Sequence, residues 1–413
     1  MAPERTRRAG LMLLRNPRIK IAFMLHSNSL AGAERLHLDL LDDLDRKVFA
    51  TLTILPNYDG LLDSKLLEKK RQFIKIDGLE WWANNTFSNI EEFNEKQRIP
   101  LSNAEFQINK FNPDFIVTHT GVIPHGALIA KKLRIPHIWF LHEFLDIDHG
   151  LHAPFGKDNF AKFVNDTSLH VIASSKSILA HFYPHDQKIL KNVCYMYPRI
   201  TKENQIHKKI NKIFTIGIVA SFQVGKGHEI LFEAIRRLNL EQKFKLRVIG
   251  DGTEGDRQRL KDIVKKLNLE NIVEFAGAME SITDIYSDLD LVVVPSLCES
   301  FGRVGIEAIK LRIPVIYSNS GGMQEYMQDG VSGLSFTPGD DLDLHDKILK
   351  IMNNPKLQSM LTETAIKHIE ESENLLQNSL FFRKLLINHH QSSTFPLKKF
   401  FFGVKNLNFI NKR

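Results

Sequence analysis

The sequence predicts an α/β fold made of two doubly wound domains, each with a parallel sheet covered by helices. Short runs rich in β-branched residues alternate with stretches of helical composition along most of the 413 residues. One polar, charged stretch without apolar periodicity, residues 199–212, interrupts this alternation and predicts a linker. No run approaches the roughly 18 apolar residues that a membrane-spanning helix needs.

The first domain is expected at residues 19–198, after a basic N-terminal tail at 1–18. Its strands are predicted at 20–27, 49–56, 115–120, 134–143 and 169–175, with helices at 32–44 and 125–133. The second domain is expected at residues 213–372. Its strands are predicted at 214–221, 244–252, 271–277, 289–296 and 313–319, with helices at 228–240, 256–269 and 305–312. The remaining segment, 373–413, is predicted to form a helix that returns toward the first domain, followed by a tail.

The composition limits the kinds of partner that the chain is expected to bind. The net charge of +7 favours anionic partners such as nucleic acid, anionic lipid or phosphorylated substrates. The absence of zinc-ligand spacing and of an aromatic RNA-binding strand motif argues against nucleic acid. Two cysteines, Cys194 and Cys298, cannot build a disulfide framework, which favours a reducing, cytoplasmic compartment.

Both ends of the chain could contact a membrane surface. Residues 1–18 are basic with a short apolar patch, and we interpret them as a solvated tail, with a membrane contact as the alternative. Residues 393–413 mix lysines and an arginine with five phenylalanines, a composition that suits the interface of an anionic membrane. Packing of this tail in a groove of the core stays equally open.

Polar and glycine residues follow successive strands of the second domain. Lys226 stands between Gly225 and Gly227 at the start of a helix, where N–H groups and the helix dipole favour an anion. Glu299 follows the apolar strand 289–296, and Glu307 lies about one turn into the next helix. Because parallel strands end at the same edge of a sheet, these side chains are expected on one rim, where ligands bind in such folds.

These segments resemble the retaining GT-B glycosyltransferases, in particular glycosyltransferase family 4. "ESFGRVGIE" is similar to the Glu-x7-Glu signature of that family, and "GKGHEILFEAI", "VIGDG", "VVVPS" and "SGGMQEYMQDGVSGL" match its other motifs in order. In the first domain "LAGAERLHLDL", "NPDFIVTHT" and "VIASSKSI" resemble the family more loosely. The resemblance covers roughly residues 20–390 and implies a GT-B fold, two Rossmann-like domains that face a deep cleft.

The resemblance also implies roles for single residues. Glu299 would accept hydroxyls of the donor sugar, Glu307 would accept the ribose diol, and Lys226 would bind the diphosphate. His119 would lie near the reacting sugar, with Glu299, His119 and Lys226 forming the catalytic set. The remaining donor-binding positions implied are Gly32, Ser221, Ala278, Met279, Ser300, Phe301, Gly302 and Arg303.

Two positions depart from the family pattern. Ser221 stands where the family usually has an arginine, five residues before the lysine, so one positive charge on the diphosphate is missing. Arg303, at a helix start just after Gly302, is hypothesised to supply it. Ala31 replaces the first glycine of the usual pair.

Other conspicuous residues allow two interpretations each. His142 and Glu143 follow a strand and could contact a ligand or form a structural pair. Trp81 and Trp82 are interpreted as core, with an exposed platform for lipid or sugar rings as the alternative. "DID" at 146–148 and "DLD" at 288–290 match a metal-binding Asp-x-Asp pattern in letters only, so no metal site is expected.

The sequence is therefore interpreted as a glycosyltransferase that moves a sugar from a UDP- or GDP-sugar to a glycan or lipid-linked acceptor with retention and without a bound metal. Bacterial surface polysaccharide or lipopolysaccharide assembly, at the cytoplasmic face of a membrane, is the expected setting. A nucleotide-sugar epimerase of the same fold and a non-catalytic scaffold are the alternatives. The motifs do not specify the donor sugar, the base or the acceptor.

Overall fold

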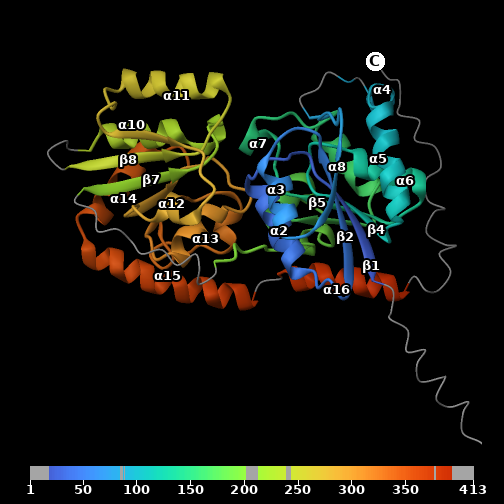
Figure 1. The fold of residues 1–413 in the computed structure, drawn as a ribbon. Coiled ribbons are helices and arrows are strands. Elements are labelled where there is room, and N and C mark those ends of the chain that lie inside the picture. Colours follow the sequence, from blue (N-terminus) through green and yellow to red (C-terminus); the bar gives the residue numbers. More distant parts are fainter. Residues whose placement is uncertain are drawn as a thin grey trace, which may run out of the picture.

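The computed structural model describes residues 18–83, 87, 89–200, 213–238, 243–375 and 378–392. The chain forms two lobes that lie side by side, each with a six-stranded parallel sheet and covering helices (Figure 1). These two sheets confirm the predicted fold class. The predicted N-terminal tail up to residue 17, the linker from 201 to 212 and the segment 393–413 lie outside the described residues.

The first sheet has the strand order β3-β2-β1-β4-β5-β6. Its strands are β1 (Ile19–Met24), β2 (Phe49–Pro56), β3 (Gln72–Ile76), β4 (Phe115–Thr118), β5 (His137–Leu141) and β6 (His170–Ala173). The helices of this lobe are α2 (Gly32–Asp43), α3 (Leu61–Glu68), α4 (Ile90–Lys96), α5 (Arg98–Phe111), α6 (His125–Leu133), α7 (Asp146–His149), α8 (Lys157–Asp166), α9 (Lys176–Phe182) and the 3-10 turn η1 (Ile189–Lys191). The strand order reverses between β1 and β4, so the carboxyl ends of these strands open a crevice of the kind that binds ligands.

The second sheet has the order β12-β11-β10-β7-β8-β9. Its strands are β7 (Phe214–Val219), β8 (Phe244–Ile249), β9 (Val273–Gly277), β10 (Leu291–Val294), β11 (Val315–Ser318) and β12 (Leu334–Phe336). The helical segments are η3 (Val224–Lys226), α10 (His228–Arg236), α11 (Glu254–Lys266), α12 (Ile282–Tyr286), α13 (Arg303–Lys310), η4 (Gly321–Glu325) and α14 (Asp341–Met352). Here the order reverses between β7 and β10, the strands that precede Lys226 and Glu299.

Two C-terminal helices run along one side of both lobes (Figure 1). Helix α15 (Pro355–Leu375) lies against the second lobe, and α16 (Ser379–Ser392) lies against the first. Phe382 and Leu386 of α16 are fully buried in the core cluster of the first lobe, where Phe382 stacks on Phe140 with ring centroids 6.3 Å apart. The apolar face of α16 is thus part of the first lobe's core. None of the helices in the described ranges is both long and apolar enough to cross a bilayer.

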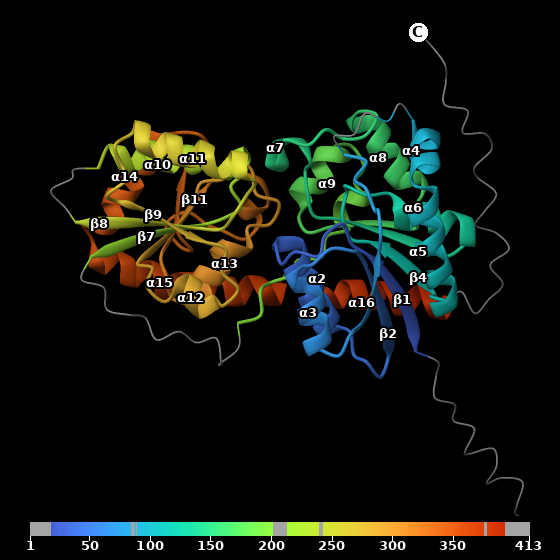
Figure 2. The ribbon, with the colours of Figure 1, turned by 45° about the horizontal axis from the view of Figure 1, so that its top comes forward.

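The lobes touch at the carboxyl ends of their strands. Helix α7 lies at their border in both views (Figures 1 and 2) and packs on η3, where His149 Nδ1 lies 2.7 Å from Gln223 Oε1. At another edge of the border, the carboxylate of Glu325 accepts hydrogen bonds from the first lobe. Its donors are Lys176 N at 2.9 Å, Ser177 N and Oγ at 2.8 Å, and Tyr195 Oη at 2.7 Å.

Every strand predicted from the sequence is present, close to its expected bounds. The expected strand 134–143 is shorter, because Arg134 ends α6 in the left-handed conformation and β5 begins only after Pro136. Strands β3 and β12 were not predicted, and both lie at sheet edges.

Candidate active site

Lys226 and Glu299 form an ion pair at the switch point of the second sheet. Lys226 ends the 3-10 turn η3, and Gly227 follows in the left-handed conformation (φ 72°), where a Cβ would meet the carbonyl oxygen of Pro295 at 2.0 Å. Leu297 N donates to Gly225 O at 2.9 Å, which ties the lysine loop to the glutamate loop. As a result Lys226 Nζ lies 2.9 Å from Glu299 Oε1, with each side chain about one-seventh exposed, at 14% and 15%.

The pair holds both groups in their charged forms. Burial opposes charge on Glu299, but Lys226 and the hydrogen bond from Ser296 Oγ at 2.6 Å outweigh it and lower the pKa of this carboxyl. Burial likewise opposes charge on Lys226, and the carboxylate of Glu299 outweighs it and raises the pKa of the ammonium. This rim therefore offers a fixed cation and a fixed anion side by side, which suits a ligand with phosphate and hydroxyl groups.

Glu307 lies one turn into α13 and is 8% exposed. Gly302 precedes the helix with φ 78°, and a Cβ there would meet the side chain of Met323 at 2.5 Å. Tyr286 Oη donates to Glu307 Oε2 at 2.8 Å, and Arg303 Nη2 lies 3.4 Å from Oε1. The carboxylate is thereby oriented on both oxygens.

Arg303 joins the lobes. Its Nη1 donates to Oδ2 of Asp39 on α2 at 2.8 Å, and its Nη2 lies near Glu307. The sequence hypothesis placed this guanidinium on a phosphate to compensate for Ser221, whereas the structure engages it with two carboxylates. Ser221 is exposed, and its Oγ lies 3.3 Å from Gln223 Oε1.

The other second-lobe positions line the same edge. Ala278 is exposed just after β9, beside the half-buried Met279. Ser300 is half-buried, while the side chain of Phe301 is buried against Tyr195 and Tyr197, with ring centroids 6.3 and 5.7 Å away. Phe301 is therefore a packing residue of the lobe border, and only its backbone could face a ligand.

In the first lobe, Gly32 and His119 lie at the carboxyl edge of the sheet. Gly32 is the exposed first residue of α2, and a Cβ there would meet open space. His119 follows β4, is 1% exposed, and its Nδ1 lies 3.0 Å from Nε2 of His142. Burial, reinforced by His37 and His26, lowers the pKa of His119 well below its ordinary value, so the ring is neutral at pH 7.

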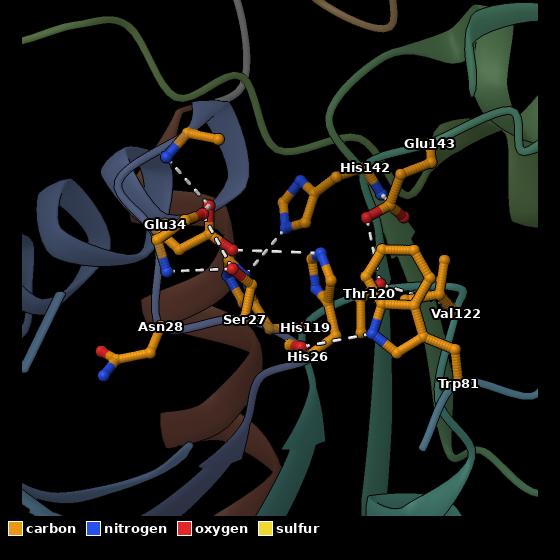
Figure 3. A network of polar contacts seen from close by, with 12 residues as sticks. His26, Ser27, Asn28, Glu34, Trp81, His119, Thr120, Val122, His142 and Glu143 are labelled. Atoms are coloured by element: carbon orange, nitrogen blue, oxygen red, sulfur yellow. Dashed lines mark hydrogen bonds and ion pairs between the residues drawn. The ribbon is translucent and has the colours of Figure 1, made fainter. Parts of the chain in front are cut away.

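Sequence reasoning named His142 but missed two other residues near His119, His26 and Glu34, which Figure 3 shows. His26 follows β1, and Glu34 is the third residue of α2; both lie near His119 and His142 (Figure 3). Glu34 is 1% exposed, and burial raises its pKa to about 7. A glutamate in the first turn of a helix ordinarily caps it at the surface, so the sequence carried no signal that this one is buried.

The ambiguous residues separate clearly. Glu143 accepts hydrogen bonds from Thr120 Oγ1 and Gly121 N, both at 3.0 Å, and thus acts as a structural brace for the loop after β4. Trp82 is core, 1% exposed, and donates to Gly121 O at 2.9 Å. Trp81 is 39% exposed, and its Nε1 lies 3.3 Å from the carbonyl oxygen of His26, so it lies against His26.

The two Asp-x-Asp triplets are used structurally. Asp148 is buried and accepts from Phe144 N at 2.9 Å, Asp288 pairs with Arg247, and Asp290 accepts from Thr215 N at 3.0 Å. Among the described residues no group of three histidine, cysteine or carboxylate side chains is arranged to hold a metal ion.

Comparison with known proteins adds to this geometry. Residues 199–368 match the family model of glycosyl transferases group 1. An uncharacterised glycosyltransferase of Methanocaldococcus jannaschii is 30% identical over 245 residues, which is 58% of this chain and 65% of that protein. A capsular polysaccharide biosynthesis glycosyltransferase of Staphylococcus aureus is 28% identical over 169 residues, 41% of this chain and 44% of that protein. The matches thus span less than two thirds of the length of these relatives.

Solved structures align over nearly the whole chain. The Anabaena protein HepE in complex with UDP-glucose superimposes with a TM-score of 0.74 at 21% identity, covering 91% of this chain and all of that one. The architecture is therefore the GT-B fold, and the second lobe, which carries Lys226, Glu299 and Glu307, is the part that matches glycosyl transferases group 1.

Proposed function

We propose that this chain is a glycosyltransferase of the family 4 type, which transfers a sugar from a UDP- or GDP-sugar with retention of the anomeric configuration. The observation that carries the proposal is the paired Lys226 and Glu299 at the switch point of the second sheet, followed in the next helix by the oriented carboxylate of Glu307. HepE, which shares this fold, was crystallised with UDP-glucose and with UDP, which supports a nucleotide-sugar donor.

In this proposal each side chain of the rim has a distinct task. Lys226 exchanges Glu299 for the diphosphate and stabilises the negative charge that develops on the leaving phosphate. Glu299 then accepts hydroxyls of the donor sugar, and Glu307 accepts the two hydroxyls of the ribose. Gly302, Ala278 and Met279 offer backbone to the sugar and the base, with Ser221 and Ser300 beside them.

His119 would lie on the opposite side of the reacting carbon. As a neutral, buried imidazole it can accept or donate one hydrogen bond without adding charge next to an oxocarbenium-like centre. Lys226 and helix N-termini would neutralise the diphosphate in place of a metal ion, so the proposed reaction is metal-independent.

The setting is also a proposal. Relatives with capsular polysaccharide names favour an acceptor that is a glycan or a lipid-linked glycan of a bacterial surface polymer, lipopolysaccharide included. Such an acceptor would be met at the cytoplasmic face of a membrane, and the basic, aromatic segment 393–413 has the composition for that contact. The first lobe, residues 19–198, would take the acceptor, and residues 213–372 the donor.

A thermal-shift panel with UDP, GDP, UDP-glucose and GDP-mannose, each with magnesium and with EDTA, tests the donor. A ligand that binds only the native state raises the melting temperature. We expect one nucleotide series to stabilise the protein equally with and without magnesium, and Lys226→Ala to abolish the shift. No shift with any of these ligands would refute the proposal, and a shift that needs magnesium would refute metal independence.

A further inference from the structure

Glu34 leaves one of its two carboxyl oxygens unused in a buried place. Its Oε2 accepts from the backbone N of Ala31 at 3.1 Å and lies 3.3 Å from Ser29 Oγ, which completes the cap of α2. Its Oε1 is buried and has no hydrogen-bond partner in the protein; His26 Nε2, at 4.0 Å, is too far away. Capping of α2 therefore explains the position of Oε2 but gives no role to Oε1.

Three imidazoles near Glu34 also carry a buried nitrogen without a hydrogen-bond partner. His26 Nδ1, His119 Nε2 and His142 Nδ1 are buried without a hydrogen-bond partner, although His119 and His142 bond to each other through their other nitrogens. The rings come from the loops after β1, β4 and β5, three adjacent interior strands of the first sheet (Figure 3). An unsatisfied buried polar atom is costly, so such atoms gathered at one strand edge indicate a ligand that satisfies them.

Trp81 packs against the ring of His26 and holds it in position. Trp81 meets it edge-on, with ring centroids 5.3 Å apart, and the indole Nε1 lies 3.3 Å from the His26 carbonyl oxygen. Trp81 is 39% exposed, so it forms an aromatic border between this cluster and the solvent. A partly exposed aromatic face next to hydrogen-bonding groups is suited to the apolar face of a sugar ring.

The chemistry of the cluster selects for a neutral ligand. Burial lowers the pKa of His26 to about 3 and that of His119 and His142 well below 6.5, so each ring is neutral and offers one donor or acceptor. No lysine or arginine forms an ion pair or a hydrogen bond with any of these four side chains in the described part of the chain. The neighbouring Arg35 directs its Nε to the carbonyl oxygen of Leu30. A phosphate or carboxylate would thus meet Glu34 without a counter-charge.

We infer that Glu34 and His26 bind hydroxyl groups of a neutral, polyhydroxylated acceptor sugar and position it beside His119. This inference rests on the proposed function, because it names the acceptor class for the same proposed reaction. Glu34 and His26 are positioning residues, and a hydroxyl can accept from one and donate to the other, which neutral imidazole and carboxyl groups allow.

Saturation-transfer difference NMR on the full chain with UDP present tests the inference. The probes are methyl α-D-glucopyranoside, methyl α-D-galactopyranoside and methyl α-D-mannopyranoside, with glucose 6-phosphate as the charged comparison. The variants are Glu34→Gln, which keeps a capping oxygen but places an amide where Oε1 was, and His26→Ala. The matched control is Asp343→Asn, the third residue of α14, whose carboxylate accepts from Thr337 N at 2.8 Å on the exposed surface.

We expect at least one neutral glycoside to bind the wild type and the control, with affinity reduced about tenfold in each of the two test variants, the loss of roughly one hydrogen bond. UDP affinity should stay within about twofold in all of them. Unchanged glycoside binding in folded Glu34→Gln and His26→Ala, no binding of any glycoside, or preference for glucose 6-phosphate would overturn the inference. Circular dichroism melts establish folding, and either variant alone suffices if the other unfolds.

The two proposals fail separately. If UDP does not bind the wild type but a glycoside binds through Glu34, the donor proposal fails and the glycoside site stands. If UDP binds and the glycosides ignore both variants, the donor proposal stands and this inference fails.

Discussion

Lys226 Nζ lies 2.9 Å from Glu299 Oε1, although the two residues belong to loops after different strands and are 73 positions apart. Under the proposed function, each would lose the other as its partner when a donor binds. A diphosphate would draw the ammonium away from the carboxylate, and a sugar hydroxyl would compete with the ammonium for that carboxylate. The ion pair would then hold both side chains in place before the donor binds, and breaking it would lower the affinity for a nucleotide without its sugar.

This relationship predicts opposite effects of Glu299→Gln on binding and turnover. The amide fills the same volume but no longer holds the ammonium, so we expect UDP to bind the variant more tightly, by a factor of about three to ten. Turnover of the nucleotide sugar should fall by about a hundredfold, because a charge-assisted hydrogen bond to the sugar is lost. Isothermal titration with UDP and a coupled assay measure the two effects; weaker UDP binding would show that Lys226 is not restrained by Glu299.

The Lys226–Glu299 pair also predicts that part of the folding stability is lost in acid. The pKa of Glu299 is lowered in the folded protein, so its contribution is present above the unfolded value near 4.5 and is lost as pH falls through the lower folded value. Lys226→Met removes the partner, so the stability difference between wild type and variant should be constant from pH 6 to 8 and shrink below about pH 4.5. Urea unfolding at a series of pH values measures it, and a difference that does not shrink in acid would contradict the pairing.

Glu34 predicts the opposite pH dependence: its contribution to folding stability should be lost as the pH rises. Its folded pKa of about 7 exceeds the ordinary 4.5, so its contribution is fully present below 4.5 and is lost as pH rises through 7. Glu34→Gln cannot ionise and should gain stability relative to wild type between pH 5 and pH 8, by up to roughly 3 kcal/mol, because the folded pKa of Glu34 is about 7 instead of 4.5. A Glu34→Gln difference that is flat with pH would mean that the carboxyl is solvated.

Arg303 predicts coupling across the lobes instead of compensation for Ser221. Because its guanidinium holds Asp39 and Glu307, Arg303→Ala and Asp39→Asn should each weaken UDP binding and should be far from additive when combined. Ser221→Arg should not rescue Arg303→Ala. If that double variant regains an appreciable part of the lost turnover, the original hypothesis of a substitute phosphate ligand is correct and the bridge to Asp39 opens when the donor binds.

The C-terminal segments are expected to separate into a structural and a dispensable part. Phe382 is fully buried in the core of the first lobe, so Phe382→Ala should cost about 3–5 kcal/mol of stability. Deleting 393–413 should leave the melting temperature unchanged and reduce co-sedimentation with anionic vesicles. Unfolding of the truncated chain would instead show that this segment packs on the core.

The central strands and the rim of the second lobe could be predicted from sequence because their signals are local. Apolar β-branched runs mark strands buried on both faces, and glycine, lysine and glutamate after each run mark the ligand edge. Strand β3, "QFIKI", lies at the sheet edge and is only partly buried, so its composition does not stand out. Strand β12 has three residues, too few for a periodic pattern.

Contacts between distant residues could not be predicted. The bridge from Arg303 to Asp39 joins positions 264 apart, and its existence depends on how the lobes face each other. Likewise, the burial of Glu34 follows from the packing of α2 against the loops after β1 and β4, while its place in the sequence is that of an ordinary surface cap. Reasoning from local sequence therefore found the rim of the second lobe and named His142, but it missed His26 and Glu34 beside His119.

Glu325 lies at one edge of the lobe border and takes four hydrogen bonds from the first lobe. A carboxylate held in this way can act as a pivot about which the second lobe rotates. Rotation of the second lobe about it would leave the Glu325 edge almost still, while the rim with Lys226 and Glu299 would sweep along an arc toward or away from His119. Under the proposed function, such a rotation would change the distance between donor and acceptor, so a small loss of order at Glu325 would be magnified into misalignment of the two sugars.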